Sequence, residues 1–152
     1  KAGQRLAQLI DGPALRLASP LGRTVATARL VFGDQPFDTD PRLVEIGTGD
    51  WTGAHLPTLS ASHPDIFSAP AFEWYDRAPG GETMAGLSRR IAGFIEDLAG
   101  QRPEHPVIIV THGVTLRMLR AQLLGLSVAD ETHIDFPQGA IHHVTNGTAR
   151  LV

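Results

Sequence analysis

A histidine stands where a predicted strand meets a predicted helix. Residues 107–110 form an apolar run of strand length, and His112 follows it between Thr111 and Gly113. In open α/β sheets, ligands bind at the carboxyl ends of strands, and the unpaired N–H groups of a helix start favour an anion. Gly113 has no Cβ and allows close approach. We therefore expect His112 and Gly113 to contact an anion such as phosphate, unless His112 only caps the helix or bonds a nearby carbonyl group.

An arginine follows a second predicted strand. Residues 14–18 are expected to form this strand. Ser19 before Pro20 is typical of the start of a helix, which places Arg23 in its first turns. A cation is unfavourable at the positive end of a helix dipole, whereas a guanidinium matches the oxygens of a phosphate group bidentately. Arg23 is therefore either a phosphate ligand or a solvated surface side chain, which is the commoner situation for arginine.

Two glutamates lie in glycine-rich segments. Glu45 stands between Val44 and Ile46. A carboxyl group in apolar surroundings keeps its proton to a higher pH than usual and can serve as a general acid. The alternative is an ordinary exposed glutamate at a strand end. Glu82 falls in the first turn of a predicted long helix, where its negative charge is stabilising without any further role.

The other histidines occupy no junction between a strand and a helix. They are His55, His63, His105, His133, His142 and His143. His133 and Asp135 could bind a metal ion together with His142 or His143, but nothing in the sequence fixes the geometry that a ligand set requires. We therefore expect no metal site.

Helices alternate with strands along the chain. Helical spacing of apolar residues predicts helices over 2–10, 20–32, 84–98 and 114–124. Strands are expected at 14–18, 107–111, 140–145 and 148–152, the last two joined by Asn146-Gly147, a type I′ hairpin signal. This order predicts an α/β fold, a three-layer sandwich with helices on both faces of a mostly parallel central sheet. Residues 107–110, apolar on both faces, indicate a central strand with neighbours on both sides. So few strands make a thin sheet, and we expect at least one further strand.

The length of 152 residues predicts a single domain over 1–152. Between residues 33 and 81 the periodicity weakens, and Pro, Gly, Asp and Thr are frequent. Short helices are expected near 56–61 and 64–68. Long irregular excursions in compact domains often serve as lids or binding loops, so we interpret 33–81 as a cap over a site.

The composition excludes several classes of protein. A formal net charge of −3 argues against nucleic-acid binding. No apolar run approaches the roughly 20 residues of a membrane-spanning helix. The chain has no cysteine, and so it forms no disulfide, no thiolate metal site and no thiol nucleophile. This composition suits a cytoplasmic protein, and we expect that location.

Four of these segments, taken in order, resemble the histidine phosphatase superfamily, the phosphoglycerate mutase-like proteins. The family pattern S-x-x-x-R-x-x-x-T-A is matched by Ser19, Arg23, Thr27 and Ala28. The pattern L-x-E-x-x-x-G-x-W-x-G is matched by Leu43, Glu45, Gly49, Trp51 and Gly53. The pattern P-x-G-E-[ST] is matched by Pro79, Gly81, Glu82 and Thr83, and the strand ending in (S/T)-H-G by Ile108 to Gly113. Each motif is weak by itself, but four in the family's order over nearly the whole chain are specific.

The resemblance implies the phosphoglycerate mutase-like fold and phosphoryl transfer through a phosphohistidine, without a metal or other cofactor. Arg23 and His112 would hold the phosphate oxygens, with contributions from Gly113 and, less directly, Glu82. Glu45 would protonate the leaving oxygen and then help to activate water. Trp51 and residues 70–77 would form part of a roof that selects the substrate, with plain packing as the alternative.

One family motif has no match in this chain. The nucleophilic histidine of the family lies in an R-H-G triplet at the end of the first strand, and no such triplet occurs here. Residues 1–10 resemble the helix that normally follows that strand. We therefore expect the first strand, the nucleophile and one phosphate-binding arginine to be absent from this sequence, not relocated within it.

For the intact protein, the resemblance implies a metal-independent phosphomonoester hydrolase acting on a small phosphorylated metabolite, as a monomer or homodimer. The segment between Glu45 and Pro79 is short, as in the compact phosphatase branch of the family. A cofactor-dependent phosphoglycerate mutase is the first alternative. If the chain truly starts at Lys1, a non-catalytic phosphate-binding module is the second.

Overall fold

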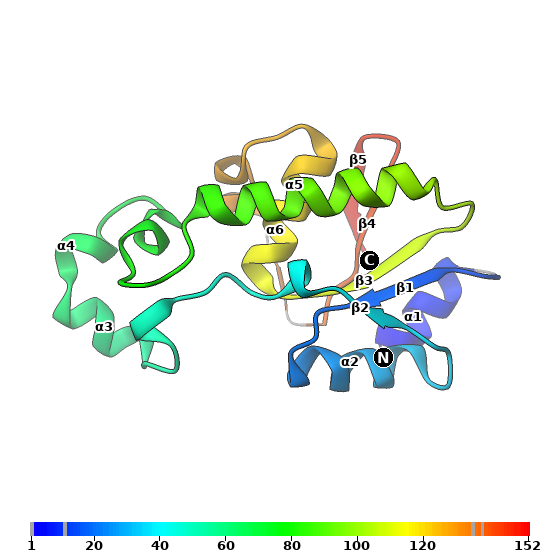
Figure 1. The fold of residues 1–152 in the computed structure, drawn as a ribbon, viewed down its shortest axis with the longest axis horizontal. Helices are drawn as coiled ribbons and strands as arrows, with labels where there is room; N and C mark the ends of the chain where they lie inside the picture. Colours follow the sequence, from blue (N-terminus) through cyan, green and yellow to red (C-terminus); the bar gives the residue numbers. More distant parts are fainter. Residues whose placement is uncertain (1, 11, 135, 138) are drawn as a thin grey trace.

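A three-stranded parallel sheet forms the centre of the protein (Figure 1). The structure is a computed structural model, and it describes residues 2–10, 12–134, 136–137 and 139–152. Strand β1 (Leu15–Ala18) lies between β2 (Asp38–Thr39) and β3 (Val107–Val110) and runs parallel to both. The α/β class and the parallel sheet predicted from the sequence are confirmed.

Helices cover both faces of this sheet. Helices α1 (Ala2–Leu9) and α2 (Gly22–Phe32) lie on one side, and α5 (Met84–Gln101) and α6 (Gly113–Leu124) on the other (Figure 1). Ile109 of β3 packs with Leu87 and Met118 from α5 and α6, whereas Ile108 packs with Phe32 of α2. Successive side chains of a strand point to opposite faces, so the apolar run 107–110 supplies two cores at once. The predicted three-layer arrangement is confirmed.

One prediction about the sheet is wrong. Strands β4 (His142–Thr145) and β5 (Thr148–Leu151) pair with each other and not with the central sheet, although Asn146 and Gly147 form the predicted hairpin turn with φ values of 49° and 70°. Among the strands that the structure describes, β3 pairs with β1 alone, so its second neighbour stays a prediction, as does the further strand.

Some element boundaries also differ from prediction. Helix α2 begins at Gly22 with Leu21 as its N-cap, so the predicted capping role of Ser19 is wrong. The Ser19 hydroxyl accepts from the N–H of Leu21 at 3.3 Å and also contacts His112 at 2.8 Å. Helix α5 continues through Gly100 to Gln101 and ends at Arg102, which has a φ of 45°. Within the described residues, no helix has the length and apolar character needed to cross a membrane.

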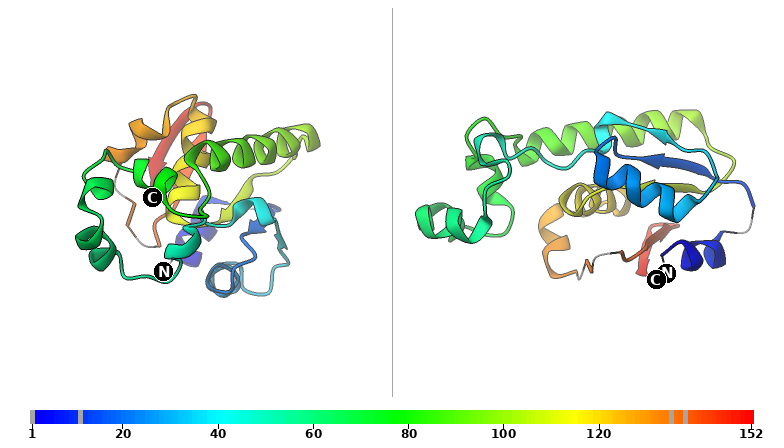
Figure 2. Two further views of the ribbon diagram at one scale, coloured as in Figure 1. Left: turned by 60° about the vertical axis from the view of Figure 1, so that its left-hand side comes forward. Right: turned by 90° about the horizontal axis from the view of Figure 1, so that it is seen from below.

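The excursion 33–81 contains β2 and several short helices. These are η1 (Pro41–Leu43), η2 (Gly49–Trp51), α3 (Leu56–Ser62), α4 (Pro64–Phe67) and η3 (Glu73–Arg77). The part from η2 to η3 forms a lobe that extends beyond the sheet (Figure 2). Stacked or tilted aromatic rings fill it: the Trp51 ring lies 5.4 Å from His63, and Trp74 lies 5.2 Å from Phe67 and 3.8 Å from Tyr75, between centroids. Half-buried aromatic rings therefore pack together within the lobe.

A buried ion pair joins α6 to η4 (Val128–His133), the short helix that follows it. Arg120 Nε lies 3.0 Å from Glu131 Oε2, in an orientation that is not that of a hydrogen bond, and the two residues are 8% and 1% exposed. Next to this pair, the His142 ring stacks on Phe136 with centroids 4.2 Å apart, and its Nδ1 lies 3.5 Å from Arg120 Nη1. An ion pair therefore connects η4 to α6, and the imidazole of His142 connects the hairpin to the same arginine.

This arrangement predicts a pH-dependent stability. Burial lowers the pKa of His142 below its usual 6.5, and the charges of Arg120 and Arg117 lower it further. Because the folded state disfavours the imidazolium, this stabilisation is complete above the ordinary pKa and is lost as the pH falls through the lowered one. We expect the free energy of unfolding to decrease between about pH 7.5 and 5.5, and to decrease less in His142→Gln.

Urea unfolding at several pH values measures this effect. His105 is exposed, so His105→Gln is the control and should keep the pH dependence of the unchanged protein. Equal slopes for His142→Gln and the unchanged protein would show that His142 does not contribute.

Candidate active site

His112 is buried at the junction of β3 and α6, 8% exposed. Its Nε2 lies 2.8 Å from Ser19 Oγ, and its Nδ1 accepts a hydrogen bond of 3.2 Å from Arg23 Nε. Because an arginine nitrogen only donates, a neutral His112 carries its proton on Nε2 and donates it to Ser19. His112 is the N-cap residue of α6 by position, but its side chain makes no capping hydrogen bond to the helix.

The charges around His112 favour its neutral form. Burial is the main cause that lowers the pKa of His112, and the guanidinium of Arg23 is the next. The carboxylate of Glu45 acts in the opposite direction, and Arg90 adds a smaller lowering. A phosphate dianion placed beside these cations would favour the imidazolium instead, because an opposite charge stabilises the charged form.

Glu45 lies at the N-terminus of α6. Its Oε2 accepts a hydrogen bond from the backbone N–H of Val114 (3.2 Å), and its Oε1 accepts one from the N–H of Thr115 (3.0 Å) and lies 3.0 Å from the Thr115 hydroxyl oxygen. The N–H groups and dipole of a helix start stabilise a negative charge. A carboxylate of the protein itself therefore occupies part of this helix start, and the phosphate contact of His112 and Gly113 stays a prediction. Polar donors hold the carboxylate, not the apolar neighbours that the sequence suggested.

The segment that carries Glu45 follows η1 and has no strand partner of its own. Two threonines at the start of α6 hold it. Thr111 Oγ1 donates to the carbonyl oxygen of Leu43, and Thr115 Oγ1 donates to that of Val44, both at 2.7 Å. Side-chain hydroxyls thus supply hydrogen bonds that a sheet would otherwise supply.

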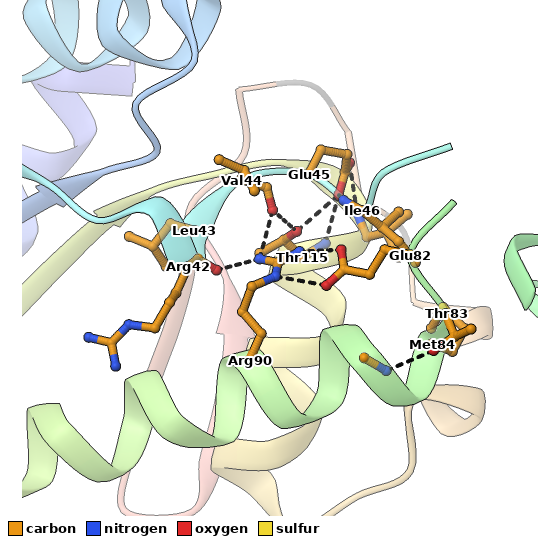
Figure 3. A network of polar contacts seen from close by, with 12 residues as sticks. Arg42, Leu43, Val44, Glu45, Ile46, Glu82, Thr83, Met84, Arg90 and Thr115 are labelled. Carbon is orange, nitrogen blue, oxygen red and sulfur yellow. Dashed lines mark hydrogen bonds and ion pairs between the residues drawn. The ribbon is translucent and has the colours of Figure 1, made fainter. Parts of the chain in front are cut away.

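Arg90 of α5 holds the same segment from the other side (Figure 3). Its Nη1 donates to the carbonyl oxygens of Arg42 and, at 3.0 Å, Val44. Its Nε and Nη2 donate to the two carboxylate oxygens of Glu82 at 2.9 and 2.6 Å. Arg90 was not among the site residues predicted from the sequence. The available signal was a cation at the edge of the apolar stripe of α5, eight residues after Glu82.

The glycine-rich segments 47–53 and 79–81 meet at Gly49. The N–H of Asp50 donates to the carbonyl oxygen of Pro79 at 2.9 Å, and Gly49 has a φ of 52°. A Cβ at Gly49 would lie 2.1 Å from the Pro79 oxygen and 2.4 Å from the nitrogen of Gly81. Only glycine fits both this backbone conformation and this approach.

The structure thus brings three of the predicted site residues together. Arg23 and His112 share a hydrogen bond, and Glu45 lies on the first turn of the helix that His112 precedes. Gly113, the first residue of this helix, lies beside Glu45, since a Cβ there would be 3.9 Å from Oε2. The Glu82 carboxylate is engaged with a cation of α5. The possible metal ligand Asp135 lies outside the residues that the structure describes.

A sequence model of the histidine phosphatase superfamily (branch 1) matches residues 1–151. The chain belongs to this superfamily. Among curated histidine phosphatases, it is 32% identical to the adenosylcobalamin/alpha-ribazole phosphatase of Escherichia coli K12 over 141 residues, which cover 90% of this chain and 70% of that enzyme. It is 33% identical to the glucosyl-3-phosphoglycerate phosphatase of Mycolicibacterium vanbaalenii over 130 residues, which cover 76% of this chain and 56% of that enzyme.

The fold agrees with solved histidine phosphatases. The alpha-ribazole phosphatase from Shigella flexneri superposes with a TM-score of 0.75 at 30% sequence identity, over 99% of this chain and 78% of that one. The predicted membership of the family and its phosphoglycerate mutase-like fold are confirmed. The chain spans 56% and 70% of the length of the two curated histidine phosphatases above.

Proposed function

We propose that this chain provides the phosphate-binding and acid–base groups of a metal-independent phosphomonoester hydrolase that acts through a phosphohistidine. The observation that carries this proposal is the convergence of Arg23, His112 and Glu45 where β1 and β3 end. A guanidinium, an imidazole and a carboxylate within one site supply charge neutralisation and proton transfer.

In the first step, a nucleophilic histidine attacks phosphorus in line with the leaving oxygen. Arg23 and His112 bind the equatorial oxygens and disperse their charge. Glu45 gives its proton to the leaving oxygen, so that the P–O bond breaks and an alcohol departs. In the second step, Glu45 takes a proton from the water that attacks the phosphohistidine, and inorganic phosphate is released. Oε2 has one hydrogen bond, from Val114, and is the oxygen we assign to proton exchange.

We infer that the nucleophile comes from an Arg-His-Gly segment that is not part of residues 1–152. A strand parallel to β3 on its outer edge would end beside His112, since both strands would finish at the same edge of the sheet. The arginine of the triplet would complete the group of cations around the phosphate.

Substrate selection is assigned to the lobe between η2 and η3. Burial raises the pKa of Tyr75 to about 12, and the negative charge of Glu45 adds to this effect. The hydroxyl of Tyr75 therefore stays protonated and lies within electrostatic reach of the acid. With Trp51 and Trp74 it forms the roof that we propose for the site. A small phosphorylated metabolite is the proposed substrate and the cytoplasm the proposed location.

Hydrolysis of p-nitrophenyl phosphate in the presence of a chelator tests this function in a protein that includes the Arg-His-Gly segment. We expect turnover that the chelator does not change, and about 100-fold lower kcat in His112→Ala, because one stabilising donor of the transition state is lost. His105→Ala, at an exposed position, is the control.

Loss of turnover on adding chelator would contradict the metal-free mechanism, and full activity of His112→Ala would contradict the role of His112. Residues 1–152 alone should show no turnover. Efficient hydrolysis by them would overturn the placement of the nucleophile.

A further inference from the structure

Three consecutive backbone carbonyl groups precede Glu45, and each accepts hydrogen bonds from side chains of other elements. They are the carbonyls of Arg42, Leu43 and Val44, and their donors are Arg90, Thr111 and Thr115. Figure 3 shows the contacts of Arg90 and Thr115. Arg90 is the donor that reaches two of the three. The backbone from which Glu45 projects is therefore held by side chains that the proposed reaction does not use.

Glu82 connects Arg90 to the other end of the same segment. Its carboxylate binds the Arg90 guanidinium through two hydrogen bonds, and its backbone N–H donates to the carbonyl oxygen of Gly47 at 2.8 Å. The Arg90 and Glu82 side chains are 17% and 24% exposed. Arg90 thus holds the chain before Glu45, and Glu82 holds it two residues after.

We propose that Arg90 and Glu82 form a positioning pair that keeps the Glu45 carboxylate on the first turn of α6. The pair touches no reacting atom, and its catalytic effect rests on the proposed function of Glu45. The same contacts give Glu82 a role different from the phosphate contact expected from the family resemblance.

Charge explains why both members are needed. The positive charge of Arg90 contributes to the lowered pKa of His112, so this charge acts within the site. Without Glu82, this half-buried cation would have no carboxylate partner and would compete with the N–H groups of Val114 and Thr115 for Glu45. Without Arg90, the carbonyls of Arg42 and Val44 would lose a donor. Either change releases Glu45 from α6.

Amide hydrogen exchange at Val114 and Thr115 tests the positioning directly, because these N–H groups donate to Glu45. We expect exchange about tenfold faster at both amides in Glu82→Gln, which keeps the shape of the side chain. Arg90→Lys should give a smaller increase, since it keeps the charge. Arg89→Gln, at the exposed neighbouring position of α5, is the control and should change neither amide. Unchanged exchange in Glu82→Gln and Arg90→Lys would overturn the proposal.

A second readout separates positioning from substrate binding in the protein that carries the Arg-His-Gly segment. An alkyl phosphate needs a proton donor for its leaving group more than p-nitrophenyl phosphate does. We expect kcat for the alkyl phosphate to fall about tenfold more than that for p-nitrophenyl phosphate in Glu82→Gln, with KM unchanged and with partial recovery in Arg90→Lys.

The two outcomes against this proposal are distinct. A raised KM with unchanged kcat would assign Glu82 to substrate binding, and equal losses for both substrates would indicate general destabilisation. If the unchanged enzyme shows no turnover, the proposed function fails, and the exchange of the two amides still decides whether Arg90 and Glu82 hold Glu45.

Discussion

Glu45→Gln should lower kcat for an alkyl phosphate by about 100-fold or more in the protein that carries the Arg-His-Gly segment, the contribution typical of a general acid. Glutamine keeps the length of the side chain, and its single amide oxygen can accept from the N–H of Thr115 or that of Val114 but not from both. It has no acidic proton to give to the leaving oxygen. The fold should be kept, and KM should change little because the groups proposed to bind phosphate are unaltered.

Steady-state kinetics across pH, with substrates of different leaving groups, measure this effect. The loss should be smaller for p-nitrophenyl phosphate, whose leaving group departs without a proton. Glu73→Gln is the control, since Glu73 is an exposed carboxylate of the lobe. An equal loss for both substrates would argue that Glu45 has no role as an acid.

Glu131→Gln should destabilise the protein by about 3–5 kcal/mol, the usual cost of removing one partner of a buried ion pair. Glu131 is 1% exposed and faces Arg120, which is 8% exposed and has little access to water. The variant leaves the guanidinium buried without a compensating negative charge. The interaction of Arg120 Nη1 with His142 cannot replace it, because a 3.5 Å contact to a neutral ring carries no countercharge.

Urea unfolding of the single variants and of Arg120→Met/Glu131→Leu separates the cost of an unpaired charge from the contribution of the pair. The double variant should recover most of the lost stability. Asp97→Asn is the control: its side chain is 63% exposed in an ion pair with Arg42, and it should cost about 1 kcal/mol or less. A Glu131→Gln variant as stable as Asp97→Asn would show that the buried pair is well solvated.

The sequence predicted the helices and strands of this fold better than it predicted which strands pair with one another. Helix α6 was predicted within one residue of both ends. Gly125 and the change from an apolar strand to a helical pattern at His112 are both local signals. Strand β2 was missed, because two residues without apolar alternation give no local signal. The hairpin was recognised from Asn146-Gly147, but its separation from the central sheet depends on packing that no local pattern records.

In the candidate site too, residues in local motifs were predicted, and residues that act through distant contacts were not. Arg23, Glu45 and His112 were identified because their motifs lie in order along the chain. Arg90 was not, since its role depends on carbonyl groups more than 40 residues away, at Arg42 and Val44. Ser19 was interpreted as a helix cap because capping is a local role, whereas its hydroxyl bonds His112 across 93 positions. Contacts of this kind become visible only once the chain is folded.

The contact between Gly49 and the backbone of residues 79–81 has a consequence for how this chain can diversify. Together with the hydrogen bond from Glu82 to Gly47, it closes the chain on itself at the base of the lobe. Closing a longer loop costs little, about 0.6 kcal/mol for each doubling of its length. The residues between can therefore be lengthened, shortened or exchanged without moving Glu45, so that the proposed roof can vary while the proposed phosphate-binding groups stay in place.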